Sequence, residues 1–306
     1  MNIYKQNFAL RNIVLALCCS VVLSLASCNQ NNQTDDLNAD DLQDLGTTVI
    51  SETETSASST SISDAITGAG VFNAPITEIQ TRSSEARGLP AGCPTIVAGS
   101  KTDTDLDGVP DSITYEFDAI KCKQDVPAKR GGGTQTISGQ LQIVDTSPTP
   151  DRSYRETLLN LKYERNPLLK PKFTETRDGT REVTQFGTTA LTKNYDVTLV
   201  RMVAGRFKTT LVNHMSFTFQ VSGTGTIDLN QPLPAGTFAV NGSNEFIFGN
   251  GVSRTFSTKT QVPLVYDPTC DSQRIVGGEL RLSKPNTTIK IVFQACGTEP
   301  VISKIP

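Results

Sequence analysis

One acidic stretch in the first half of the chain has residue types and spacing that could bind a cation. The range Asp103–Asp111 reads DTDLDGVPD, so carboxylates stand at positions 1, 3, 5 and 9 and a glycine at position 6 allows a tight turn. Several oxygen ligands with negative charge favour Ca²⁺ over softer metals. We expect one Ca²⁺ ion, with an ion-free acidic turn as the alternative. The expected ligands are the side chains of Asp103, Asp105, Asp107 and Asp111 and the backbone carbonyl of Val109.

The loop differs from an EF-hand at position 12, where Thr114 stands in place of a bidentate glutamate. It resembles the calcium loop of thrombospondin type 3 repeats, although those are usually tandem and this chain has one copy. We expect the ion to be structural rather than catalytic, bracing the segment between Cys93 and Cys122.

The cysteines indicate an exported, disulfide-bonded protein. The chain has seven, of which Cys18 and Cys19 lie in an apolar N-terminal run and Cys28 directly follows it. Four remain, which allow three pairings. We predict the sequence-local pairs Cys93–Cys122 and Cys270–Cys296, each contributing about 3 kcal/mol by closing a loop. Zinc is not favoured, because no CxxC spacing occurs and His214 is the only histidine.

The N-terminus has the pattern of a secretory signal. Lys5 and Arg11 precede an apolar run over residues 13–26, and small residues lead to Cys28. The sequence LASC at 25–28 resembles the lipobox of bacterial lipoproteins. This resemblance implies that residues 1–27 are removed and that Cys28 carries lipid such as palmitate. It places the protein at the bacterial outer membrane, on its periplasmic or cell-surface face. An ordinary secretion signal cut nearby is the alternative.

A polar segment follows the signal. Residues 29–81 contain nine acidic residues and no Lys or Arg, and they are rich in Ser and Thr. Such a composition buries too little apolar surface to offset the entropy of ordering. We therefore expect residues 28–88 to form a lipidated, disordered tether. The net charge of −3 leaves the remaining body nearly neutral, which argues against nucleic-acid binding.

Residues 89–306 are expected to form a β-rich body. Apolar residues alternate along many short segments, as in Ile289, Ile291 and Phe293, and turn residues separate these segments. The predicted fold class is all-β, either an antiparallel β-sandwich or an extended meander. A weak internal echo between 111–122 and 288–296, and between 136–143 and 274–282, suggests two similar lobes, 89–205 and 206–306. The order of the two echoed pieces is reversed, however, so a tandem repeat is not supported.

The whole arrangement is similar to uncharacterised β-rich lipoproteins of Gram-negative bacteria, which implies a location and a β fold but no activity. Nucleophile-elbow, zinc-protease and dinucleotide-binding motifs do not occur in the sequence. We expect no enzyme, but a lipid-anchored envelope protein with a structural or binding role, stabilised by Ca²⁺ and two disulfides. Its expected partners are the membrane and an unidentified protein or glycan. The alternatives are a hydrolase acting on envelope or extracellular polymers and a carrier of an apolar ligand.

Overall fold

The computed structural model describes residues 42–43, 45–50, 53, 90, 92–107, 109–125, 132–151, 153–168, 172–203, 207–227, 233–249, 251–270 and 274–305. The signal, Cys28 and most of the expected tether lie outside these residues. Most described residues belong to strands: β1 (Thr95–Gly99), β2 (Ser112–Phe117), β3 (Lys123–Asp125), β4 (Thr134–Asp145), β5 (Tyr154–Asn166), β6 (Phe173–Phe186), β7 (Ala190–Val203), β8 (Phe207–Val221), β9 (Gly236–Ile247), β10 (Ser253–Tyr266), β11 (Ile275–Lys284), β12 (Thr287–Phe293) and β13 (Val301–Ile305).

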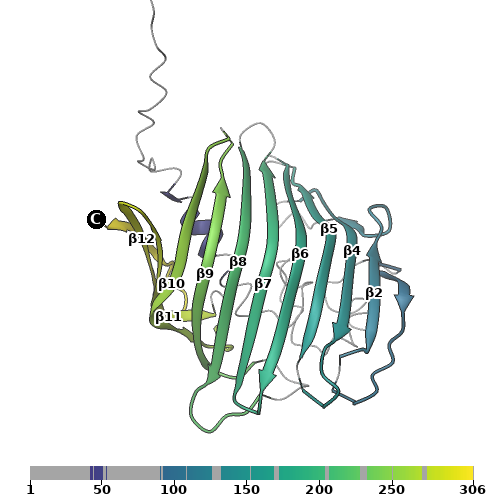
Figure 1. Ribbon diagram of the computed structural model, residues 1–306. Coiled ribbons are helices and arrows are strands. Elements are labelled where there is room, and N and C mark those ends of the chain that lie inside the picture. The colour runs from purple at the N-terminus through teal and green to yellow at the C-terminus, as the bar shows by residue number, and fades with distance from the viewer. Residues whose placement is uncertain are drawn as a thin grey trace, which may run out of the picture. The chain divides into compact units, whose positions relative to one another are not determined.

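The strands form one antiparallel sheet in which sequence neighbours lie side by side. The order is β1-β2-β4-β5-β6-β7-β8-β9-β10-β11-β12-β13, and β3 pairs with β4 off this path (Figure 1). Every pair of neighbours is antiparallel, so short turns suffice to join them. The prediction of an all-β antiparallel fold is confirmed. Of its two architectures, the extended meander describes the sheet.

The sheet continues through the boundary proposed between two lobes. Strands β7 and β8 pair along their whole lengths, from Ala190↔Gln220 to Val203↔Phe207. The expected boundary at 205/206 falls in the connection between these two paired strands. Residues 39–306 accordingly form one compact unit. The division into lobes 89–205 and 206–306 is therefore wrong, because its boundary is a hairpin within one sheet.

One face of the sheet carries the buried side chains, and we call it the inner face. A row of residues in register crosses it from β2 to β12: Ile113, Ile143, Glu156, Arg181, Tyr195, Met215, Gly242, Thr258, Leu282 and Ile289. Side chains alternate along a strand, so the residues between these rows point to the other face, which we call the outer face. His214 and Asp196 pair there at 3.0 Å, both largely exposed.

The internal echo has a structural basis at the two ends of the sheet. Phe117 of β2 stands opposite Gly139 of β4, and Phe293 of β12 stands opposite Gly278 of β11. Both glycines have φ of 108°. A Cβ would lie 2.2 Å from a backbone oxygen at Gly139 and 2.5 Å from one at Gly278. Both positions therefore require glycine, and the echo records matched local geometry rather than repeated lobes.

Both predicted disulfides are confirmed. Cys93 and Cys122 join with their Cα atoms 5.2 Å apart, and Cys270 and Cys296 join at 5.7 Å. The first bond links the start of β1 to the turn after β2, and the second links the turns that precede β11 and follow β12. Each end of the sheet is thus closed by its own disulfide.

A short helix lies inside the segment expected to be a tether. Residues 42–43 and 45–50 are helical, and the side chains of Leu45 and Val49 are buried. Gly46 lies so close to β13 that a Cβ would be 2.5 Å from Ile302. For these residues the prediction of disorder is wrong, because Leu45 and Val49 are spaced four apart and pack with one face of the helix.

Candidate cation-binding loop and a charged inner face

The acidic loop connects β1 to β2 and is closed by backbone hydrogen bonds. Ser100 N–H donates to the carbonyl of Ser112 at 3.1 Å, and Asp111 N–H donates to the carbonyl of Thr102 at 2.8 Å. These bonds extend the hairpin beyond its paired strands. The residues between Thr102 and Asp111 must therefore turn back within a short span.

Side chain to backbone hydrogen bonds fold this span into a turn. Oδ1 of Asp103 accepts from Leu106 N–H at 2.8 Å and from Asp107 N–H at 3.2 Å. Leu106 has a φ of 65°, in the left-handed region that residues other than glycine rarely adopt. As a result, carboxylate oxygens of Asp103, Asp105 and Asp107 lie within 4.8 Å of one another. The structure thus brings together three of the four predicted carboxylate ligands.

Asp107 is the most buried member of this triad, at 2% exposure. Its Oδ1 accepts a hydrogen bond of 2.6 Å from Val109 N–H. Its Oδ2 is buried and has no hydrogen-bond partner among the described residues, and the same holds for Oδ2 of Asp105. A buried carboxylate oxygen without a donor is costly unless a cation binds it.

The electrostatics of the loop favour a neutral or cation-bound Asp107. Burial raises the pKa of Asp107 to about 7, and the hydrogen bond from Val109 offsets only part of this rise. The negative charges of Asp105, Asp145 and Asp103 raise the pKa further. The residues fit a divalent cation, because oxygen donors and accumulated negative charge are the features that Ca²⁺ sites share.

Asp111 and Val109 have more limited roles in the structure. The carboxylate of Asp111 accepts hydrogen bonds from Thr104, at 2.9 Å from its N–H and 2.7 Å from its hydroxyl. These bonds lower the pKa of Asp111, and they brace the loop. Asp111 lies outside the triad, so its role as a ligand stays a prediction, as does that of the Val109 carbonyl.

Sequence reasoning missed two further aspartates, namely Asp145 beside the loop and Asp151, whose charge acts on Asp145. Asp145 ends β4, and its N–H donates to the carbonyl of Asp111 at 3.3 Å. Burial raises the pKa of Asp145, and the charges of Asp105, Asp151 and Asp111 add to the rise. Oδ1 of Asp151 is buried without a hydrogen-bond partner in the described part of the chain. Only the pairing of β2 with β4 places Asp145 next to the loop, and no local sequence motif predicts this contact.

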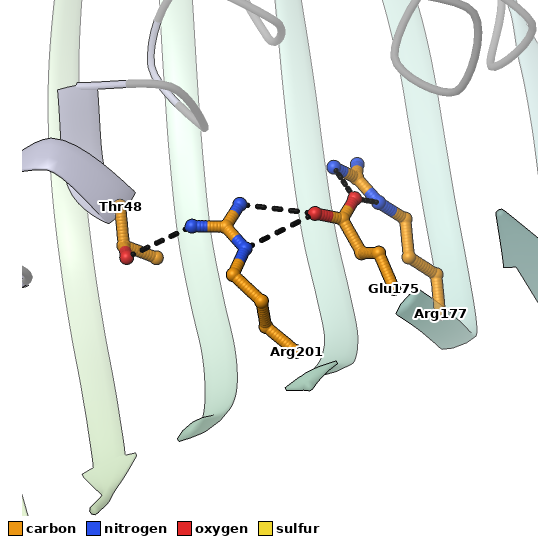
Figure 2. A network of polar contacts seen from close by, with 4 residues as sticks. All are labelled: Thr48, Glu175, Arg177 and Arg201. Carbon is orange, nitrogen blue, oxygen red and sulfur yellow. Dashed lines mark hydrogen bonds and ion pairs between the residues drawn. The ribbon is translucent and has the colours of Figure 1, made fainter. Parts of the chain in front are cut away.

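A second polar cluster occupies the inner face of β6 and β7. Figure 2 shows Glu175 between two arginines, with Arg177 at 2.6 Å on one carboxylate oxygen and Arg201 at 2.9 Å on the other. Arg201 also donates to the hydroxyl of Thr48 at 3.2 Å, which ties the N-terminal helix to β7. The sequence analysis did not identify this cluster.

Glu175 remains charged despite its burial. Burial by itself would raise the pKa of Glu175, but the charges and hydrogen bonds of Arg177 and Arg201 outweigh it and hold that pKa below its usual range. The carboxylate therefore acts as a fixed counter-ion for two guanidinium groups. Because each oxygen of Glu175 already has a partner, we interpret this cluster as a structural one that stabilises the fold.

Comparison with protein-family models, curated protein sequences and solved structures found no match for this chain. Within the described ranges, no helix is long and apolar enough to cross a membrane.

Proposed function

We propose that this chain is a lipid-anchored protein of the bacterial envelope with a binding role, and that Asp103, Asp105 and Asp107 hold one structural Ca²⁺ ion. The environment of the Oδ2 atom of Asp107 is the observation that supports the calcium site most directly. That oxygen is buried and has no hydrogen-bond partner among the described residues. Direct coordination by a cation would satisfy it.

The donor set favours Ca²⁺ over Mg²⁺. Ca²⁺ accepts six to eight oxygen ligands in irregular geometry, whereas Mg²⁺ demands a near-ideal octahedron. The three carboxylates come from one short turn, with Asp111 and the Val109 carbonyl as the further predicted donors. The ion would supply positive charge against mutually repelling carboxylates and hold the β1–β2 loop in one conformation.

The sequence around Cys28 supports the lipid anchor. The packed helix at 45–50 limits how far the anchor can lie from the folded body. Leu45, the first fully buried residue described, stands 17 residues after Cys28. A chain of that length reaches roughly 55 Å when fully extended. The greatest distance between the folded body and the membrane would thus be shorter than the expected tether of residues 28–88 would allow.

The calcium site is tested by melting the mature chain in EGTA, in millimolar Ca²⁺ and in millimolar Mg²⁺. We expect Ca²⁺ to raise the melting temperature by several degrees, because it binds only the folded loop, and Mg²⁺ to raise it less. The Asp107→Asn variant should lose this rise. Asp267→Asn is the matched control, because Asp267 caps a turn through Thr269 outside the acidic loop. Equal melting of the wild type in EGTA and Ca²⁺ would overturn the site.

The anchor is tested separately by the Cys28→Ala variant in cells. Wild-type protein should partition into the detergent phase and label with palmitate, whereas the variant should be recovered in the aqueous phase. Detergent partitioning of the variant at the wild-type level would contradict lipidation of Cys28.

A further inference from the structure

Two buried cations stand next to each other on the inner face of β6 and β7. Arg181 of β6 pairs in register with Tyr195 of β7, and Lys193 lies two residues before Tyr195 on the same face. Arg181 is 3% exposed and Lys193 is 1% exposed. Diagonal neighbours of this kind are within reach of one another's long side chains.

Arg181 differs from the other buried arginine of its strand. Arg177 is paired with Glu175, as Figure 2 shows. By contrast, Nε and Nη1 of Arg181 are buried and have no hydrogen-bond acceptor among the described residues. The guanidinium carbon of Arg181 lies 5.0 Å from the ring centroid of Tyr195, and a contact with the ring face does not satisfy the N–H groups on Nε and Nη1. A buried guanidinium is costly unless an anion accepts those donors.

The inner face of β5–β7 carries an excess of positive charge. Its ionisable acidic and basic side chains are two carboxylates and five cations: Glu156, Glu175, Arg165, Arg177, Arg181, Lys193 and Arg201. Both oxygens of Glu175 are engaged by Arg177 and Arg201. Glu156, opposite Arg181 on β5, is the one other carboxylate of this set.

Apolar side chains flank Lys193 on both neighbouring strands. The register neighbours of Lys193 are Val183 on β6 and Phe217 on β8, and its Nζ lies 5.8 Å from the ring centroid of Phe238. These apolar neighbours would favour a ligand that brings its own apolar body.

We propose that the inner face binds an anionic amphiphile, whose carboxylate or phosphate group pairs with Arg181 beside Lys193 and whose apolar body packs toward Phe217 and Phe238. The inference gives a ligand class to the binding role proposed above and rests on that role. It does not depend on the calcium loop, so failure of one site leaves the other standing.

The test measures ligand binding to the full mature chain carrying Cys28→Ala, which avoids detergent. Isothermal titration would compare decanoate, decyl phosphate, decanol and acetate. We expect decanoate or decyl phosphate to bind at least tenfold tighter than decanol, and acetate to bind weakest, because head group and apolar body both contribute. The tighter of the two anions identifies the source as a carboxylate or a phosphate amphiphile.

Arg181→Met in the same background should lose at least tenfold in affinity for the anionic probes while keeping its affinity for decanol. Arg181→Lys should retain part of the preference. Arg155→Met is the matched control, since Arg155 precedes Glu156 but lies on the outer face in an exposed pair with Glu182. Equal affinity of the wild type for decanoate and decanol, or an unchanged preference in a folded Arg181→Met variant, would overturn the proposal. If Arg181→Met does not fold, the wild-type comparison of decanoate with decanol decides alone.

Discussion

The two halves of the sheet share one architecture but bury different chemistry. Strands β5–β7 place charged side chains on the inner face, including Glu175 with its two arginines. Strands β8–β10 place aromatic rings there, such as Phe219 and Phe238 with centroids 4.7 Å apart. Aromatic packing needs no partner beyond its neighbours, whereas each buried charge must be matched. A bound anion would therefore stabilise the charged half more than the aromatic half.

The strands at the two ends of the sheet show the same contrast. β2 with β4 matches β12 with β11, each pair carrying a glycine of φ 108° and its own disulfide. Yet β12 leads to the terminal strand β13 through residues 294–300, whereas the terminal strand β1 leads to β2 through the acidic loop at 100–111. The elaborated connection lies on the charged side of the molecule. The acidic loop and the charged inner face therefore both lie in the part of the sheet formed by β1–β7.

The largest expected effect is in the aromatic half. Phe219→Ala should lower the free energy of unfolding by about 3–5 kcal/mol, because it empties a fully buried ring site. Urea denaturation would measure the change. Phe186→Ala is the control, since Phe186 is exposed, and it should change stability by less than about 1 kcal/mol. Equal losses in the two variants would mean that burial of the ring does not determine the loss of stability.

The acidic loop should make ion-free stability depend on pH. The pKa of Asp107 is about 7 in the folded protein and 3.8 in the reference state, so this group stabilises the fold at low pH and loses that contribution as pH rises through this window. The part of this loss that falls between pH 5 and pH 8 amounts to at most about 3 kcal/mol. Urea unfolding in EGTA at pH 5 and pH 8 would measure it. Asp107→Asn should lack the loss and exceed the wild type at pH 8 without calcium; a shared pH slope would contradict the account.

The ionic half should depend on its counter-ion. Glu175→Gln leaves Arg177 and Arg201 without a buried negative charge and should cost about 3 kcal/mol. The difference from wild type should persist at neutral pH and vanish as pH falls through the depressed pKa of Glu175. Chemical denaturation at two pH values measures both. Arg155→Met, on the outer face, should cost less than about 1 kcal/mol.

The matched glycines should respond alike. Gly139→Ala and Gly278→Ala each place a Cβ against a backbone oxygen, and each should cost about 2 kcal/mol. Thermal melting of the two variants gives the comparison. A large loss at one site and none at the other would show that the two ends are not equivalent.

Much of the fold could be predicted from the sequence because strand patterns are local. Alternation in segments such as Ile289–Phe293 indicated strands, and short separations favoured the observed disulfides. The helix at 45–50 was missed because Ser- and Thr-rich flanks outweighed the spacing of Leu45 and Val49. The bulge at Asn160, with φ of 49°, lets both Leu158 and Leu161 face inward, which neither helical nor strict strand periodicity describes.

The candidate sites were predictable only in part. The triad lies in one turn, so its residues were visible as a motif, whereas Asp145 joins them only through strand pairing. The charges of β6 were not visible as buried, because polar residues occupy both faces of that strand. Arg177 and Arg181 therefore resemble solvent-facing residues until the register assigns them to the inner face.

Asp107 and its neighbours are proposed to hold one Ca²⁺ ion. The most direct measurement is a calorimetric calcium titration of the metal-free mature chain, with Asp107→Asn and Asp267→Asn in parallel. The account predicts one ion per wild-type chain, the same binding in Asp267→Asn, and at least a tenfold loss in Asp107→Asn. No binding at millimolar calcium, or unchanged binding in Asp107→Asn, would contradict it.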